Sequence, residues 1–343
     1  MKKSMILLLF LELIISGKSD FDIDIDTDFI FKAKCEDNKA KTGQCLYSIY
    51  DAKKDSYEYA IFDKCGKGKK CIEKGICLKY PDKIKNGKSC NYDEDCSSRS
   101  CINKKCVAAK EGEKCDSVNC EAGLTCYEDN KNDVKKCAIP AKEGTKPENT
   151  NCMEGLLRDN DDKCAKYGIL DDGSELKGES AKLCKSGLAH YNKDSKKTIC
   201  DSIETDPICE GSVIKTKGKW KDGTEIGDYD SCDRKTDYNG VEKFYYRNSK
   251  LQSKLYGEFL EAYKDLDLDK INSKEGSYWL SGKVNEKYLL YKYAPALEAA
   301  GIINSEGKVV NDKKCEYEFM IKHLHSSFIK LKTIIIAMIV LLF

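Results

Sequence analysis

The chain has 343 residues, 20 of them cysteine, and it carries an apolar run near each end. Lysine and arginine together number 59 and aspartate and glutamate 58, so the net charge is +1. This balance argues against a protein built mainly to bind nucleic acid, which would need a basic excess or a clustered basic face. Charged residues make up 34% of the chain, which excludes a bundle of membrane-spanning helices in its middle.

Residues 1–19 have the layout of a secretory signal peptide. A basic start is followed by an apolar run over residues 5–11 and then by small residues. The run is shorter than the roughly 20 apolar residues of a membrane-spanning helix, and the order of the three parts is typical of a leader that is removed. We predict cleavage after Gly17 or Ser19. An uncleaved anchor and a buried helix are the alternatives.

Residues 20–89 are predicted to form an N-terminal cysteine-containing module. Between residues 21 and 29, aspartates alternate with apolar residues, which predicts a strand with one apolar and one acidic face. We interpret the acidic face as solvated rather than as a calcium site. Five cysteines and an aromatic stretch over residues 47–62 follow, and they are enough for a small sheet.

A repeated cysteine motif occupies residues 90–209. The sequence Cys-x2-Gly-Leu begins at Cys120, Cys152 and Cys184, so that it recurs every 32 residues, and another cysteine follows each copy. A fixed period of this size is typical of stacked modules, and glycine supplies a turn that a side chain would block. Large apolar residues are few here, so disulfides must supply much of the stability. We predict tandem cysteine-rich repeats over residues 90–209 and a linker over 210–232.

All 20 cysteines lie between the two terminal apolar runs. An even number of cysteines in a secreted chain predicts complete pairing. No two cysteines are separated by two residues, so the usual spacing of a structural zinc site or a redox-active pair is missing. We therefore predict structural disulfides and no metal site, and the connectivity stays open. The predicted half-cystines are Cys35, Cys45, Cys65, Cys71, Cys77, Cys90, Cys96, Cys101, Cys106, Cys115, Cys120, Cys126, Cys137, Cys152, Cys164, Cys184, Cys200, Cys209, Cys232 and Cys315.

Parts of this array resemble modules of known secreted proteins. Four cysteines from Cys90 to Cys106 are spaced by five, four and four residues, with Asp95 before the second. This run resembles the N-terminal cysteine-rich module of Dickkopf-type proteins, as does the run from Cys115 to Cys126, although the adjacent cysteine pair of that module is absent. The whole layout is similar to that of the cysteine-rich, GPI-anchored surface proteins of ciliate-like protists. The resemblance implies small disulfide-rich modules and a surface location, and it transfers no functional residue.

Residues 233–315 are predicted to form a mainly helical subdomain. Apolar residues recur at helical spacing over residues 248–266, and a second helical stretch covers 286–293. A third, short helix is expected between Pro295 and Gly301, because proline favours the start of a helix and glycine its end.

Trp279 and the many tyrosines of this subdomain are expected to pack between its helices. Cys232 and Cys315 flank the subdomain, and a disulfide between them would close it. The predicted fold class is therefore a tandem of small disulfide-rich modules, made of short β-strands and loops, followed by a mainly α-helical C-terminal subdomain.

The last ten residues are apolar. A run of this length matches the tail of a GPI-attachment signal and is about half of what a membrane-spanning helix needs. We predict such a signal over residues 327–343, with Ser326 as the lipid attachment residue, although Phe328 is bulkier than is preferred beside an attachment site. A second small pair, Asn304 and Ser305, would discard Cys315 if it were used. A short tail anchor and a buried strand are the alternatives.

No constellation of catalytic residues stands out in the sequence. Nucleophilic catalysis by serine or cysteine usually needs a histidine. His323 and His325 stand beside the predicted processing site, which leaves His190, and we interpret His190 as an ordinary loop residue. An Asp-x-Asp-x-Asp run begins at Asp265, but it lacks the glycine that a calcium loop requires, and we interpret it as a helix end rich in solvated aspartates. We predict no enzyme activity, no cofactor and no metal.

These patterns together predict a non-enzymatic protein that a GPI lipid holds on the extracellular face of the plasma membrane. It would serve as a coat component or as a binding or adhesion module. The expected partners are the membrane, through the lipid, and an extracellular protein or carbohydrate, with no nucleic acid. The alternatives are a secreted Dickkopf-like ligand or receptor antagonist, and a secreted protease inhibitor or hydrolase.

Overall fold

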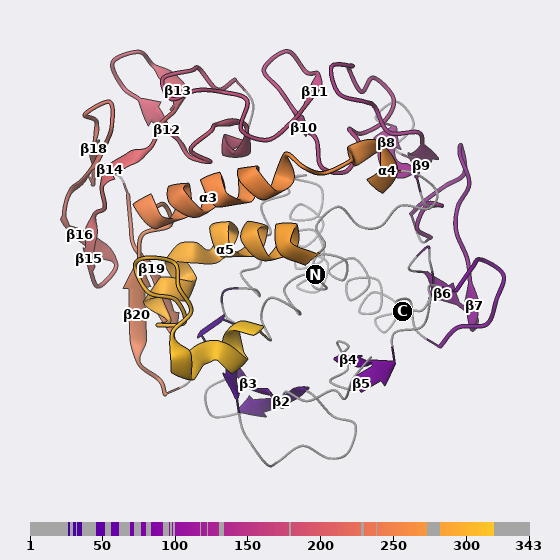
Figure 1. Cartoon of the computed structure of the whole chain (residues 1–343), viewed down its shortest axis with the longest axis horizontal. Coiled ribbons are helices and arrows are strands. Elements are labelled where there is room, and N and C mark those ends of the chain that lie inside the picture. Colours follow the sequence, from indigo (N-terminus) through magenta and orange to yellow (C-terminus); the bar gives the residue numbers. More distant parts are fainter. Residues whose placement is uncertain are drawn as a thin grey trace, which may run out of the picture.

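The computed structural model of the chain combines many short paired strands with a small helical part (Figure 1). In this coarse form the predicted fold class is confirmed. Among the residues that the structure describes, no helix has both the length and the apolar character needed to span a bilayer. The described residues are 27, 30–31, 33–35, 46–51, 56–61, 69–71, 77–79, 84–91, 96, 98, 100–116, 118–121, 123–129, 134–177, 180–227, 230–237, 239–272 and 282–318.

In the described part of the chain, the strands form two-stranded antiparallel hairpins and two three-stranded sheets, β1-β3-β2 and β14-β17-β18. Strand β1 runs parallel to β3, whereas the pairs β2–β3, β14–β17 and β17–β18 are antiparallel. The strands are β1 (Ala33–Cys35), β2 (Leu46–Asp51), β3 (Ser56–Ile61), β4 (Lys69–Cys71), β5 (Cys77–Lys79), β6 (Cys101–Ile102), β7 (Lys105–Cys106), β8 (Thr125–Asp129), β9 (Val134–Ala138), β10 (Leu157–Arg158), β11 (Cys164–Ala165), β12 (Ala189–Asn192), β13 (Lys197–Cys200), β14 (Ile203–Thr205), β15 (Ile208–Glu210), β16 (Val213–Thr216), β17 (Gly218–Trp220), β18 (Glu225–Ile226), β19 (Asp233–Thr236) and β20 (Glu242–Tyr245). The helices are α3 (Lys250–Tyr263), α4 (Leu268–Ile271) and α5 (Gly282–Ala299), with short 3-10 turns η2 (Ala181–Leu183) and η3 (Asn311–Lys313).

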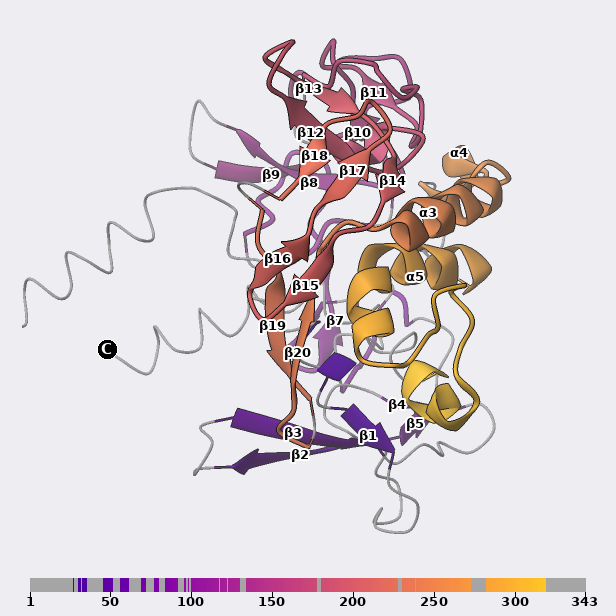
Figure 2. The same ribbon diagram turned by 90° about the vertical axis from the view of Figure 1, so that its left-hand side faces the viewer.

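The strand pairs lie around the helices. Figure 1 shows β6–β7, β8–β9, β10–β11 and β12–β13 following one another along an arc that β14 to β18 continue, with α3 and α5 inside it. Figure 2 shows helices α3 to α5 on one side of strands β12 to β20. The helices therefore form a hub against which the strand pairs can pack.

One set of bonds recurs in four cysteine segments, which we number I (84–106), II (109–137), III (141–164) and IV (170–200). In each, the first residue bridges to a cysteine in parallel register, and a disulfide joins that cysteine to the last residue of the segment. A glycine N–H donates to the carbonyl of the last cysteine at 2.7–2.8 Å. These glycines are Gly87, Gly112, Gly144 and Gly173. Their φ angles lie between +77° and +84°, a region that glycine adopts without steric cost.

Segments I and II carry a second disulfide, which in segment I joins Cys90 to Cys101. In segment IV, Leu176 and Ala189 occupy the positions that correspond to Cys90 and Cys101. The Leu176 N–H donates to the carbonyl two residues before the last cysteine, as the Cys90 N–H does in segment I. Leu176 is buried and Ala189 packs against the same small core, so an apolar contact takes the place of a disulfide in segment IV.

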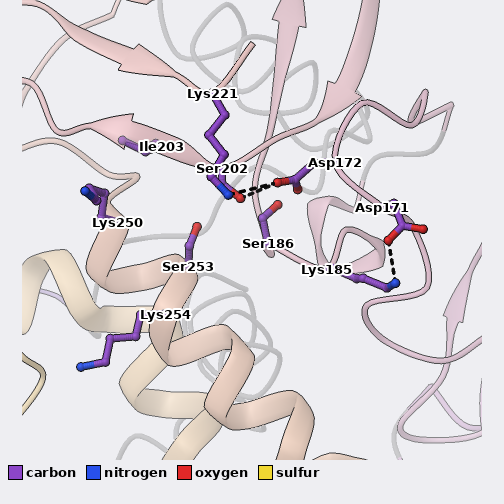
Figure 3. A pocket seen from close by; sticks show the side chains of 10 residues that line it. All are labelled: Asp171, Asp172, Lys185, Ser186, Ser202, Ile203, Lys221, Lys250, Ser253 and Lys254. Atoms are coloured by element: carbon purple, nitrogen blue, oxygen red, sulfur yellow. Dashed lines mark hydrogen bonds and ion pairs between the residues drawn. The ribbon is translucent and has the colours of Figure 1, made fainter. Parts of the chain in front are cut away.

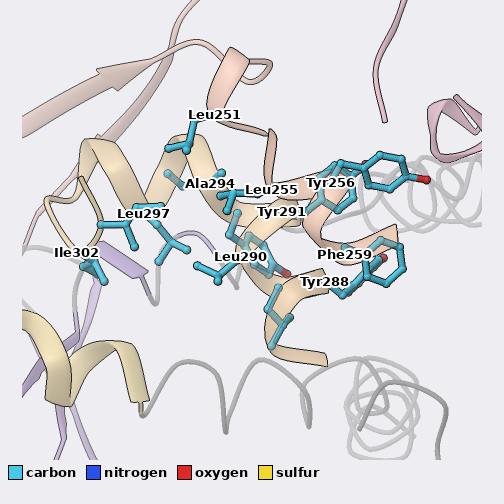
Figure 4. Close-up of a cluster of buried hydrophobic side chains, with 14 of the residues drawn as sticks. Leu251, Leu255, Tyr256, Phe259, Tyr288, Leu290, Tyr291, Ala294, Leu297 and Ile302 are labelled. Atoms are coloured by element: carbon cyan, nitrogen blue, oxygen red, sulfur yellow. The ribbon is translucent and has the colours of Figure 1, made fainter. Parts of the chain in front are cut away.

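The largest hydrophobic core lies between α3 and α5 (Figure 4). Helix α3 begins after Ser249, whose hydroxyl accepts a hydrogen bond from the Gln252 N–H, as N-cap residues commonly do. The helix predicted over residues 248–266 is thus confirmed. Aromatic rings dominate the core in stacked and edge-to-face pairs, and the prediction that tyrosines pack between the helices is confirmed. Trp279 lies outside the described residues.

Helix α5 continues through Pro295, so the prediction that this residue opens a separate helix is wrong. Proline has no N–H and removes one hydrogen bond inside a helix. Both alanines beside Pro295 are buried in the core, and this packing compensates for the missing bond. The predicted end of the helix is confirmed: Gly301 has a φ of +71° and donates its N–H to the Glu298 carbonyl.

Tyrosine hydroxyls from the two helices bind the turns of segments III and IV. Tyr263 donates to the Gly155 carbonyl at 2.6 Å and Tyr291 to the Gly187 carbonyl at 3.3 Å. These two are the glycines of the repeated Cys-x2-Gly-Leu motif, with φ angles of +91° and +70°. A Cβ on Gly187 would lie 2.6 Å from the Tyr256 ring. Glycine therefore permits both the turn and the close approach of the helix.

The disulfide between Cys232 and Cys315 that would close the helical subdomain does not form. Cys315 is bonded to Cys35 and Cys232 to Cys209. The first of these bonds joins residues 280 positions apart, so it ties the N-terminal part of the chain to the helical part. Sequence spacing could not reveal these partners, because pairing depends on which cysteines the folded chain brings together.

The strand predicted over residues 21–29 is wrong at Thr27, which has helical backbone, as have Ile30 and Phe31 just beyond it. Residues 21–26, 28 and 29 lie outside the described part. Ile30 and Phe31 are buried in the core of α3 and α5, and the Phe31 ring stacks on Tyr245 with 5.9 Å between the ring centroids. The N-terminal part is therefore joined to the helical part by packing as well as by a disulfide.

Residues 210–232, predicted as a linker, instead contain strands β16 to β18. Trp220 and Ile226 of this region are buried together with Leu188 and Ile203 in a small core of their own. Residues 233–245, predicted as part of the helical subdomain, form the hairpin β19–β20. Such short strands bury at most two side chains each, so they leave almost no alternating pattern in the sequence.

The bond between Tyr263 and segment III can be tested by Tyr263→Phe. The substitution keeps the ring but leaves the Gly155 carbonyl without that donor, so we expect the free energy of unfolding to fall by about 1–2 kcal/mol. Denaturant titration of the mature chain measures the change. Tyr191→Phe is the control, because Tyr191 is 57% exposed. Equal stability of the two variants would contradict the role given to Tyr263.

The half-buried Glu298 makes stability depend on pH. Burial, and then the negative charge of Asp206, raise the pKa of Glu298 above its usual value. Its contribution to stability is therefore present below the unfolded pKa and is lost as pH rises through the folded value. We expect Glu298→Gln to be more stable than the wild type at pH 7, by about 0.5 kcal/mol after solvent screening, and to match it near pH 4. Melting curves across this range measure the difference, and parallel pH profiles would refute it.

Candidate functional site

Eight disulfides join sixteen of the predicted half-cystines. The pairs are Cys35–Cys315, Cys90–Cys101, Cys96–Cys106, Cys115–Cys126, Cys120–Cys137, Cys152–Cys164, Cys184–Cys200 and Cys209–Cys232. For the side chains that the structure describes, the prediction of structural disulfides is confirmed. Cys45 and Cys65, and the side chains of Cys71 and Cys77, lie outside the described part, as does the predicted attachment residue Ser326.

His190 is not the ordinary loop residue that its sequence context suggests. It lies on strand β12, opposite Ile199 of β13, and its side chain is only 8% exposed. Its ring stacks on the indole of Trp220, with 4.4 Å between the centroids and 16° between the planes. The stacking holds the imidazole in one orientation.

Two carboxylates stand beside this imidazole. His190 Nε2 lies 3.2 Å from Asp222 Oδ2 and 3.5 Å from Asp201 Oδ2. The Asp201 side chain is 4% exposed and that of Asp222 is 23% exposed. Neither oxygen completes a hydrogen bond with Nε2, which is left buried and without a hydrogen-bond partner. Three side chains from three short elements therefore meet at one buried point.

Backbone hydrogen bonds hold both carboxylates in place. The Ser202 N–H donates to Asp201 Oδ1 at 2.7 Å, and the Asp222 N–H donates to Asp201 Oδ2 at 3.0 Å. Asp222 lies in the turn between β17 and β18, where the Thr224 N–H donates to its Oδ1. The Asn192 side chain donates to Asp222 Oδ2 at 2.8 Å. The carboxylates are thus oriented before any ligand arrives.

The pKa of Asp222 is lower than usual. Its partial burial acts in the opposite direction and would raise the pKa, but hydrogen bonds from Thr224 and Asn192 and the nearby His190 outweigh that effect. Asp222 therefore carries a negative charge at neutral pH. A buried negative charge needs a compensating positive partner.

A surface hollow of about 650 Å³ lies close by, between α3 and segment IV (Figure 3). Four lysines and two aspartates line it together with three serines and one isoleucine: Lys185, Lys221, Lys250, Lys254, Asp171, Asp172, Ser186, Ser202, Ser253 and Ile203. The hollow adjoins the His190 cluster along the chain, because Ser202 follows Asp201 and Lys221 precedes Asp222.

The charges around the hollow do not cancel. Lys185 pairs with Asp171 at 2.6 Å, and Lys221 lies 3.7 Å from Asp172. Lys254 donates to the backbone carbonyl of Glu306, and this carbonyl group is neutral. The four lysines of the lining, which include Lys250, therefore outnumber its two aspartates by two. An excess of this sign favours an anionic ligand.

The aspartates after α3 behave as predicted. Asp267 caps the short helix α4, where its side chain accepts the Lys270 N–H at 3.0 Å. Asp269 is exposed and pairs with Lys142 of segment III at 3.3 Å. Their interpretation as solvated groups at a helix end is confirmed for these two residues.

Comparisons of the chain with protein-family models, with curated proteins and with solved structures found no match. The functional residues must therefore be argued from geometry. Sequence reasoning missed Asp201 and Asp222 because they stand far from His190 in the chain and in no known spacing. The one signal in the sequence that could have pointed to this cluster was Trp220, because tryptophan occurs only twice in the chain.

Proposed function

We propose that this chain is a non-enzymatic extracellular protein, held at the cell surface by a GPI lipid, whose disulfide-braced body binds an anionic ligand. The observation that carries the proposal is the array of eight disulfides around one helical hub. Disulfides in this number form and persist in secreted and surface proteins. They keep such a body folded without a large core.

The four cysteine segments support a tandem array. They share the parallel bridge, the glycine turn and the disulfide. Segments III and IV each dock a glycine turn on a tyrosine hydroxyl of the hub. We propose that the four are copies of one module, and that the outer faces of the copies are free to vary as display surfaces.

The surroundings of His190 favour binding over catalysis. A nucleophilic mechanism would place a serine or cysteine oxygen or sulfur beside the imidazole. The described neighbours of Nε2 are instead two carboxylates, and the ring is stacked on an indole. This arrangement supports a role for the imidazole in binding.

The hollow beside α3 is the proposed ligand-binding surface. It lies where three parts of the fold meet, namely segment IV, the β14–β17–β18 sheet and the first turns of α3 (Figure 3). Its excess of lysine suits a sulfate or carboxylate group on an extracellular carbohydrate or protein.

The lipid anchor is tested on intact cells. We expect phosphatidylinositol-specific phospholipase C to release the protein, and mass spectrometry of the released chain to place its last residue at Ser326. A variant that lacks residues 334–343 is the control, and it should enter the medium without lipase. Protein that stays on the membrane after lipase and still carries residues 327–343 would refute the anchor. Wild-type protein already soluble in the medium would favour the secreted-ligand alternative.

The ligand surface is tested with heparin as an anionic probe. We expect the double substitution Lys221→Glu and Lys250→Glu to weaken binding at least tenfold, because it reverses two charges at the hollow. The matched control is Lys215→Glu with Lys219→Glu, on exposed positions of β16 and β17. Surface plasmon resonance at several salt concentrations measures both. Equal weakening by the control would show general charge attraction and not a site.

A further inference from the structure

We propose that His190, Asp201 and Asp222 form a binding site for a divalent transition metal ion, with Zn²⁺ as the best match. The ligand atoms are His190 Nε2 and one carboxylate oxygen from each aspartate, and all three lie within 4.8 Å of one another. Water would complete the coordination.

The distances from His190 Nε2 to the two carboxylate oxygens suit tetrahedral zinc. Zinc binds nitrogen and carboxylate oxygen at about 2.0–2.2 Å, which places tetrahedral ligand atoms about 3.4 Å apart. The two distances from His190 Nε2 are 3.2 and 3.5 Å. A cation between these atoms would therefore need little movement of the side chains.

The unpartnered nitrogen is the second, independent observation. His190 is more than nine-tenths buried, yet its Nε2 makes no hydrogen bond although two carboxylate oxygens are near. Buried polar atoms are nearly always satisfied. A metal ion would take the lone pair of Nε2 and would also supply the positive charge that the two carboxylates lack.

The surroundings of the three residues resemble the outer layer of a metal site. Each aspartate is held by backbone N–H groups, and Asn192 donates to the proposed ligand oxygen of Asp222. Trp220 fixes the plane of the imidazole. Such partners orient metal ligands and raise affinity. The imidazole disfavours calcium and magnesium, which prefer oxygen ligands alone.

A competing arrangement has no metal. In it the imidazole is protonated and forms an ion pair with both aspartates. The two arrangements differ in what a metal titration finds, because only the first provides a lone pair and an open coordination position.

The test uses the mature chain with its disulfides intact, after chelator treatment. Calorimetric titration with ZnCl₂ is expected to show one ion bound per chain, and zinc is expected to raise the melting temperature. Cobalt in place of zinc should give the intense visible absorption of a tetrahedral site. His190→Ala and Asp222→Asn should each weaken zinc binding at least tenfold.

Two variants, His190→Ala and Asp222→Asn, are used so that misfolding of one cannot explain the result. Asp222 is partly exposed, and the amide of Asp222→Asn keeps the size of the original side chain. Glu175→Gln is the matched control, because Glu175 is an acidic residue of segment IV whose ion pair with Lys197 lies at the surface. It should bind zinc as the wild type does. The proposal is overturned if the wild type binds no zinc, or if zinc binding survives in both His190→Ala and Asp222→Asn. The first result would favour the metal-free ion pair.

Discussion

The contact between the helical hub and the glycine turns is the interaction on which the rest of the structure depends. The cysteine segments are short and polar, and they bury only small cores built around their disulfides. Helices α3 and α5 provide a much larger core, and buried tyrosines of the two helices reach the turn carbonyls of Gly155 and Gly187. A tyrosine suits this task because its ring stays in the core while its hydroxyl bonds a backbone group at the rim.

The two candidate sites follow from this arrangement. Docking of segment IV on α3 places Lys185 and Ser186 opposite the first turns of the helix and so creates the hollow. Direct contacts hold the β12–β13 hairpin beside the turn between β17 and β18: His190 stacks on Trp220, and Asn192 donates to Asp222. These contacts bring His190 to Asp222. The proposed anionic-ligand surface and the proposed metal site are thus separate in chemistry and share one framework.

Local sequence signals predicted the parts of the fold that local chemistry controls. Helix α3 and the end of α5 at Gly301 were predictable, because capping residues and apolar periodicity act within a few residues. The positive φ angles of the motif glycines were likewise implied by their recurrence. Pro295 was misread because the burial of its neighbours overrides its local preference. The strands β16 to β20 were missed because each buries too few side chains to leave a pattern.

By itself, the sequence determined that the chain is rich in disulfides, that it carries a repeated cysteine motif and that helices follow that motif. These properties are written in composition, spacing and periodicity. Only the tertiary structure decided that Cys35 bonds Cys315, that segments III and IV dock on the helices and that His190 meets two aspartates. Such pairs are distant in sequence, and their proximity is set by how the whole chain packs, which no local pattern records.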